Sequence, residues 1–220
     1  LPDGRLVVGG IGLTKAAGKT VAGLAVRDPR TGAWQALSTL KTSTGRVASV
    51  YALAVDASRN LLYVAGNFSS VTRGNRRVAV VGIAQLNLKT GIWSKVGTGL
   101  SGKGISVRTL SLDAVSGNLL VGGYFTRAGG VASVNIATWS PARKRWLALG
   151  TGVKSDVVTA ALAGDGTVYA AGQFANGLVS TWNPTTKVWS AIGDARLFSD
   201  LPTSMVIDSL GHPLIGRGVG

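Results

Sequence analysis

The chain has 220 residues, enough for one sizeable core or an array of repeats, and its 23 Lys and Arg outnumber nine acidic residues for a formal net charge of +14. All nine acids are Asp, and the chain has one His and no Cys. These counts exclude disulfides, thiolate zinc sites, Cys nucleophiles and His-rich metal centres, so we expect no cofactor. The longest uncharged apolar runs fall well short of the roughly 18 residues that a membrane-spanning helix needs.

Two sequence landmarks recur along the chain. The first is a short apolar strand that ends in small residues and follows a polar turn beginning with Asp. It occurs at residues 6–10, 62–66, 120–123 and 168–172. The second is a polar turn followed by Trp. It ends at Trp34, Trp93, Trp146 and Trp189.

The second repeat contains four predicted strands. They lie at residues 50–55, 61–66, 78–86 and 92–96. Apolar, β-branched and aromatic residues fill these segments, and Gly, Asn and Asp bound them, which is the pattern of strands. No segment sustains the apolar spacing of a helix. Because four-stranded units recurring every 40–60 residues or so are typical of propellers, the sequence predicts an all-β fold, a β-propeller or a segment of one, with four-stranded antiparallel blades.

The predicted blades divide the chain into five parts within a single propeller domain or fragment. They are 1–39, with strands two to four only, then 40–99, 100–153, 154–195, and 196–220, with strands one and two only. Strand two is therefore supplied at both ends, which does not fit simple ring closure. We expect the chain to be a segment of a larger propeller, in which an anchor could lie elsewhere.

One stretch resembles a known repeat. Residues 122–139 read Gly-Gly-Tyr-Phe-Thr-Arg-Ala-Gly-Gly-Val-Ala-Ser-Val-Asn-Ile-Ala-Thr-Trp, and Trp-Leu-Ala-Leu-Gly-Thr-Gly-Val follows at 146–153. This pattern resembles the repeats of kelch/galactose-oxidase-like secreted and cell-surface propellers, which include fungal surface landmark proteins of polarised growth and bacterial exported propellers. The resemblance implies an extracellular or cell-surface scaffold. The copper and radical site of galactose oxidase does not carry over, since it needs Cys and several His.

The repeated Asp and Trp residues each have a structural and a functional interpretation. Asp3, Asp56, Asp113, Asp165 and Asp208 are predicted to cap their own turns rather than to form a ring of metal ligands. The four Trp of the second landmark are predicted to pack in the core or between blades rather than to form a sugar-stacking platform, because their place in the repeat is constant. Asn67, in an Asn-Phe-Ser sequence, is a candidate N-glycosylation site if the chain is secreted.

The basic residues favour one face of the predicted propeller. The face formed by the 2–3 and 4–1 strand connections would carry eleven basic and three acidic residues, and the opposite face nine and six. The basic loop face is the predicted ligand-binding surface, although a general solubility charge is the alternative. Its predicted ligand-binding residues are Lys15, Lys19, Arg73, Arg76, Arg77 and Arg127.

The leading functional hypothesis is a non-catalytic extracellular or cell-surface scaffold or binding module. It would be part of a larger surface assembly that binds other protein subunits or an acidic polysaccharide. Basic residues on both faces, and the lack of an Arg/aromatic recognition run, argue against nucleic acid. The alternative is a carbohydrate-active propeller enzyme, an Asp-based hydrolase or lyase, with Asp156, Asp194 and Asp200 on the loop face.

Overall fold

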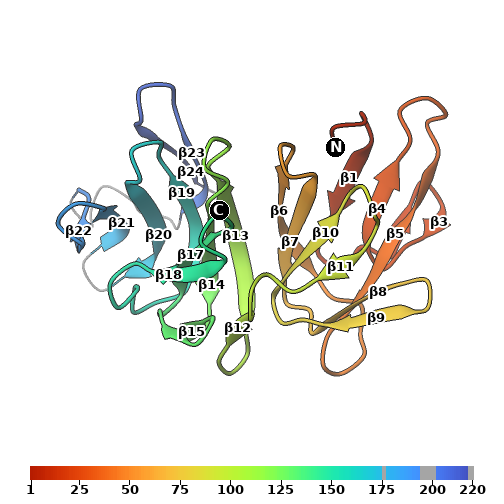
Figure 1. The fold of residues 1–220 in the computed structure, drawn as a ribbon, viewed down its shortest axis with the longest axis horizontal. Helices are drawn as coiled ribbons and strands as arrows, with labels where there is room; N and C mark the ends of the chain where they lie inside the picture. Colours follow the sequence, from red (N-terminus) through yellow and green to blue (C-terminus); the bar gives the residue numbers. More distant parts are fainter. Residues whose placement is uncertain (175–176, 194–201, 218–220) are drawn as a thin grey trace. The chain divides into compact units, whose positions relative to one another are not determined.

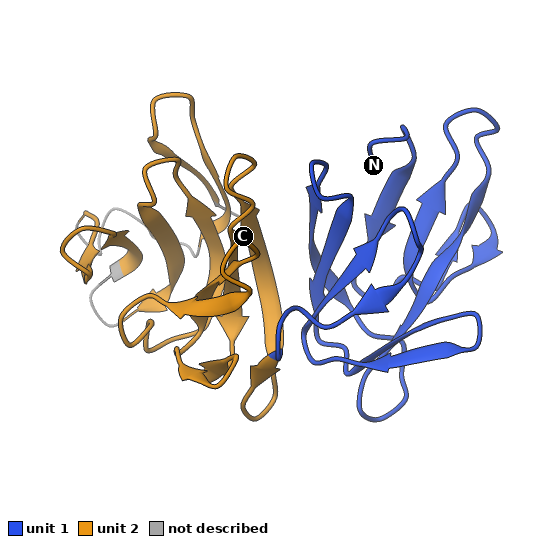
Figure 2. Ribbon diagram, in the orientation of Figure 1, with its two compact units in different colours: residues 1–99 blue, residues 100–220 orange. Residues whose placement is uncertain are grey.

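The computed structural model describes residues 1–174, 177–193 and 202–217, and these residues form antiparallel strands joined by turns (Figure 1). The described residues contain no helix, which confirms the all-β prediction and leaves no helix able to cross a lipid bilayer in this part of the chain. Two compact units make up the chain, Leu1–Gly99 and Leu100–Gly220 (Figure 2).

The first unit contains two larger sheets and a small hairpin. One sheet has the order β1-β4-β5-β8-β9 and the other the order β11-β10-β7-β6. The strands of the first are β1 (Leu6–Gly9), β4 (Gly23–Arg27), β5 (Trp34–Lys41), β8 (Ser70–Arg73) and β9 (Arg76–Ala79). Those of the second are β6 (Val50–Asp56), β7 (Leu61–Gly66), β10 (Ile83–Asn87) and β11 (Trp93–Ser94). The hairpin consists of β2 (Lys15–Ala16) and β3 (Lys19–Thr20).

The second unit contains two four-stranded sheets in which the strands follow chain order. They are formed by β13 (Ser106–Leu112), β14 (Leu119–Tyr124), β17 (Ile136–Ser140) and β18 (Arg145–Ala148), and by β19 (Val157–Leu162), β20 (Val168–Phe174), β21 (Gly177–Asn183) and β22 (Val188–Ala191). A smaller three-stranded sheet has the order β12 (Leu100–Ser101), β15 (Arg127–Ala128) and β16 (Val131–Ala132). A two-stranded sheet pairs β23 (Pro202–Ile207) with β24 (Pro213–Arg217). Such four-stranded meanders are the predicted repeat unit, whereas the blade count and ring closure stay predictions.

The single strand predicted at residues 78–86 is wrong. β9 ends at Ala79 and β10 begins at Ile83, because Gly82 adopts a φ of 72°, which an extended strand does not accommodate. β9 folds back on β8 instead, and β8 pairs with β5 through Thr39–Thr72 and Leu40–Val71. The connection between strands two and three of one repeat thus adds a hairpin to strand four of the preceding repeat.

The turn-capping role of the five repeated Asp residues is confirmed. Each accepts a hydrogen bond from a backbone N–H of its own turn. The donors are Arg5, Arg59, Val115, Thr167 and Leu210. Among the described residues, no group of three or more His, Cys, Asp or Glu side chains gathers at a point where a metal could bind. The carboxylates therefore serve to shape the turns between strands one and two.

Buried Trp93 joins the two larger sheets of the first unit. Its indole N–H donates to the Ser38 hydroxyl at 2.8 Å, and that hydroxyl donates to the Leu37 carbonyl at 2.6 Å. Both Ser38 and Trp93 are buried, so each polar group finds a partner away from water. Trp146 is also buried, while Trp34 and Trp189 are half-buried. The four repeated Trp therefore differ in how much packing each contributes.

We expect Trp93→Ala to destabilise the first unit by about 3–5 kcal/mol, because it empties a buried aromatic site and leaves Ser38 without its indole donor. Urea unfolding followed by circular dichroism would measure the loss. Trp34→Ala is the matched control at a half-buried position and should cost clearly less. Equal losses at both positions would contradict the packing role assigned to Trp93.

Acid should weaken the protein through these capped turns. The Ser116 hydroxyl, with the backbone N–H groups of Val115 and Ser116, lowers the pKa of Asp113 below its ordinary value of 3.8. Since the folded pKa lies below the unfolded one, this contribution to stability is present above about pH 4 and is lost as the pH falls through the folded pKa. Asp113→Asn keeps an acceptor oxygen but does not titrate. Its free energy of unfolding, measured with urea from pH 6 to pH 2, should fall less steeply than that of the parent, and identical pH profiles would refute the assignment.

Candidate anion-binding site

The hairpin β8–β9 presents three arginines at its tip. A two-residue turn joins its strands, and Gly74 takes the first central position with a φ of 58°, as a type II′ turn requires. Arg73 pairs with Arg76 across the turn, and Arg77 pairs with Thr72. Directly opposed residues in an antiparallel pair project to the same face, so Arg73 and Arg76 share one face and Arg77 lies on the other.

The side chain of Arg73 is held by the turn between β10 and β11. Its Nη1 donates to the carbonyl oxygen of Gly91 at 3.1 Å. That turn is shaped in its own right by Asn87, whose Oδ1 accepts the backbone N–H groups of Lys89 and Thr90 at 3.0 Å. The Arg73 guanidinium is therefore anchored by one hydrogen bond and keeps further N–H donors for another acceptor.

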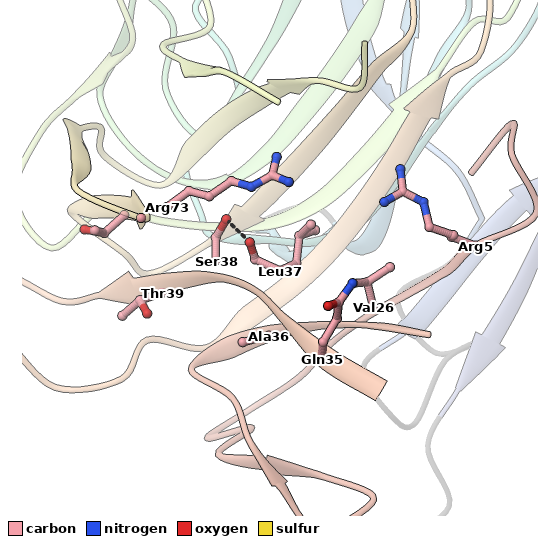
Figure 3. A pocket seen from close by; sticks show the side chains of 10 residues that line it. Arg5, Val26, Gln35, Ala36, Leu37, Ser38, Thr39 and Arg73 are labelled. Atoms are coloured by element: carbon pink, nitrogen blue, oxygen red, sulfur yellow. Dashed lines mark hydrogen bonds between the residues drawn. The ribbon is translucent and has the colours of Figure 1, made fainter. Parts of the chain in front are cut away.

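Arg73 lines three recesses in the first unit, which we call the Arg73 recesses. The first, of about 280 Å³, lies along β5 and is also lined by Arg5 and Ser38. Figure 3 shows the guanidinium groups of Arg5 and Arg73 extending over the β5 residues from opposite sides. The second, of about 230 Å³, adds Lys89. The third, of about 550 Å³, is lined by the hairpin tip and by Thr90, Gly91, Ile92 and Trp93.

All the charged residues that line these recesses are basic. No acidic residue occurs among the side chains that line them. Arg5 is compensated by Asp3, which lies 2.7 Å from its guanidinium, and this hydrogen bond is the main cause that lowers the pKa of Asp3. In the described part of the chain, Arg73, Arg76 and Arg77 form no ion pair. The site therefore presents uncompensated guanidinium groups suited to carboxylate or sulfate oxygens.

The predicted division of charge between two faces is wrong at this site. The sequence predicts Arg5, in a strand 1–2 turn, and Lys89, in a strand 3–4 turn, on the face opposite Arg73, but both line recesses with it. The reason is the added hairpin, which brings the Arg73 side chain to the β10–β11 turn. The sequence offered no signal for Arg5 or Lys89, since each belongs to an ordinary polar turn far from residue 73 in the chain.

The other predicted ligand-binding residues lie elsewhere. Lys15 and Lys19 are exposed on the β2–β3 hairpin of the first unit and line none of the Arg73 recesses. Arg127 belongs to the second unit, where its guanidinium donates to the Gly130 carbonyl oxygen of its own hairpin. Arg196, counted with the basic loop face, lies outside the described residues.

The structure describes the candidate glycosylation residue and one of the three acids of the alternative enzyme. Half-buried Asn67 uses its Oδ1 to accept the backbone N–H of Ser49 at 2.9 Å, and its glycosylation stays a prediction. Of the three acids of the alternative enzyme, Asp156 forms an ion pair with Arg108 at 2.7 Å. Asp194 and Asp200 lie outside the described residues.

Comparison with known proteins shows the fold alone. No protein-family model and no curated protein matches the sequence. Two solved structures of the extracellular domain of the BT4673 system of B. thetaiotaomicron, titled as a one-component and a hybrid two-component system, are similar to this chain. The first has a TM-score of 0.65 at 15% identity and covers 99% of this chain and 25% of that one. The second has a TM-score of 0.60 at 14% identity, and the match covers 90% of this chain and 24% of that one. The chain thus spans about a quarter of the length of each structure.

Proposed function

We propose that this protein is a non-catalytic extracellular or cell-surface binding module that holds an anionic macromolecule against the β8–β9 hairpin and the Arg73 recesses. The observation that carries the proposal is the group Arg73, Arg76 and Arg77, which has no ion-pair partner in the described residues and borders recesses without an acidic lining residue. The net charge of +14 extends the same attraction over the whole chain.

Two lines of support favour an extracellular scaffold of the propeller type. The sequence resembles kelch-like repeats of secreted and surface proteins, and its four-stranded meanders suit propeller blades. The fold is also similar to that of a domain titled extracellular. We therefore place the binding site on a blade-like scaffold within a larger surface assembly, where the loops carry the chemistry and the sheets hold it in place.

The geometry suits charge-assisted recognition. A guanidinium can donate two parallel N–H groups to one carboxylate or sulfate. The hydrogen bond from Arg73 to the Gly91 carbonyl oxygen restricts that side chain before the ligand arrives, which lowers the entropic cost of binding. Because Arg76 and Arg77 are exposed, their attraction is screened over about 8–10 Å at physiological ionic strength, so affinity should depend on salt.

Replacing Arg73, Arg76 and Arg77 together with Ser should weaken binding of dextran sulfate, used as a polyanion probe, by at least tenfold at low salt. The loss removes three uncompensated charges and slows association. Surface plasmon resonance between 50 and 300 mM NaCl would measure both, and uncharged dextran should not bind. The melting temperature should change little, because exposed charges contribute little to stability.

The matched control replaces Arg143, Lys144 and Arg145 with Ser. These three exposed residues carry the same number of positive charges as Arg73, Arg76 and Arg77, and they lie at the turn between β17 and β18 in the second unit. Binding by this variant should stay close to that of the parent. Equal losses from both triple variants would show that bulk charge alone attracts the probe, and the assignment of the site would fall.

A further inference from the structure

Strand β9 forms an exposed sheet edge beside the arginine cluster. It is the last strand in the order β1-β4-β5-β8-β9, and in the described part of the chain no other strand pairs with its outer side. Arg76, Arg77 and Ala79 are exposed along it. An unpaired edge of this kind offers backbone hydrogen-bonding groups to a further strand.

The register identifies which backbone groups point outward. In a two-residue hairpin, the residues that flank the turn, here Arg73 and Arg76, exchange hydrogen bonds. The next pair, Thr72 with Arg77, is therefore non-hydrogen-bonded, and so is the pair that contains Ala79. The N–H and C=O groups of Arg77 and Ala79 point away from β8, which makes two donors and two acceptors available at the edge.

We propose that the β9 edge binds an extended acidic segment of a partner protein as an added strand. The inference rests on the proposed function and names its ligand as an acidic peptide. Strand addition takes affinity from main-chain hydrogen bonds and specificity from alternating side chains. Both components are present here, since the free edge lies beside guanidinium groups and beside the recess that Val78 and Ile92 also line.

The alternation of side chains sets the pattern of the added strand. Strand alternation places Arg76 and Val78 on the face of β9 toward Ile92, which is 47% exposed in the 550 Å³ recess. It places Arg77, which also lines this recess, on the other face of the strand. Residues beside Arg76 and Arg77 in the added strand should therefore both be acidic. The residue beside Val78 should be apolar, because it would cover Ile92.

Charge complementarity favours this occupant over two others. A second copy of β9 would bring arginines against arginines, which destabilises a cross-strand pair. An acidic polysaccharide would satisfy the guanidinium groups, but it lacks the regular backbone N–H and C=O groups that match those of Arg77 and Ala79. An acidic strand satisfies the charges and the edge together.

The probe is a fluorescent peptide, Thr-Val-Glu-Glu-Val-Thr-Thr, with blocked ends. Its Val-Glu-Glu-Val core is palindromic, so it presents the same pattern to β9 in either strand direction. We expect saturable binding by fluorescence anisotropy. Adding the peptide should also slow hydrogen exchange at the backbone N–H groups of Arg77 and Ala79. A peptide methylated at every backbone nitrogen should bind at least tenfold more weakly, because it has no N–H group to donate to the carbonyl oxygens of Arg77 and Ala79.

The matched protein variants are Ala79→Pro and Ala132→Pro. The first removes an outward N–H of β9 without changing any charge, and Pro is tolerated at sheet edges. It should weaken peptide binding at least tenfold and leave dextran sulfate binding unchanged. Ala132 lies on β16, in the corresponding hairpin of the second unit, and its substitution should leave both unchanged. Melting curves check that each variant folds, and the methylated peptide and hydrogen exchange test the edge in the unmodified protein.

The outcomes separate this inference from the proposed function. Undiminished binding of the methylated peptide, or unchanged exchange at Arg77 and Ala79, would overturn strand addition while the anionic site stands. Binding of dextran sulfate but not of the peptide would overturn the acidic-peptide ligand in favour of a polysaccharide. If the triple Ser variant of Arg73, Arg76 and Arg77 binds dextran sulfate as well as the parent does, the proposed function itself fails.

Discussion

The pairing of β8 with β5 is the interaction on which the candidate site depends. It joins the hairpin of one repeat to the last strand of the repeat before it, and Leu40 and Val71 are both fully buried at this junction. At about 25 cal/mol per Å² of buried apolar surface, burial of these two side chains contributes several kcal/mol to the free energy of folding. The conformational entropy lost when the hairpin is ordered offsets part of that gain. A connection between strands thereby becomes part of a sheet, and the arginines at its tip acquire defined directions.

A bulge in β5 accommodates the link between the sheets. Leu24 pairs with Ser38 and Ala25 with Ala36, which leaves Leu37 as an additional residue. The Ser38 hydroxyl can then donate to the Leu37 carbonyl oxygen while it accepts the Trp93 indole N–H. Bulges redirect side chains in this manner, often beside functional sites. In this unit the bulged strand borders the first Arg73 recess.

The second unit repeats the architecture with different chemistry. Strand β12 pairs with β15 through Leu100 and Ala128, as β5 pairs with β8 in the first unit. On that hairpin, the Arg127 guanidinium donates hydrogen bonds to the carbonyl oxygen of Gly130 within the same turn. The same backbone arrangement therefore presents a cluster of three arginines, of which Arg73 is anchored on the neighbouring β10–β11 turn, in one repeat and a single arginine bonded to its own turn in the other, as expected when loops vary on a common scaffold.

The sequence alone determined the features that depend on local interactions. The strands β6 and β7 begin and end within one residue of their predicted bounds, and the turn caps such as Asp113 follow from a side chain bonding its own backbone. Tertiary structure decided the rest. The break between β9 and β10 at Gly82 and the convergence of Arg5 with Arg73 depend on which strand edge the hairpin joins. That choice follows from side-chain packing between segments distant in the chain, which local residue patterns do not encode.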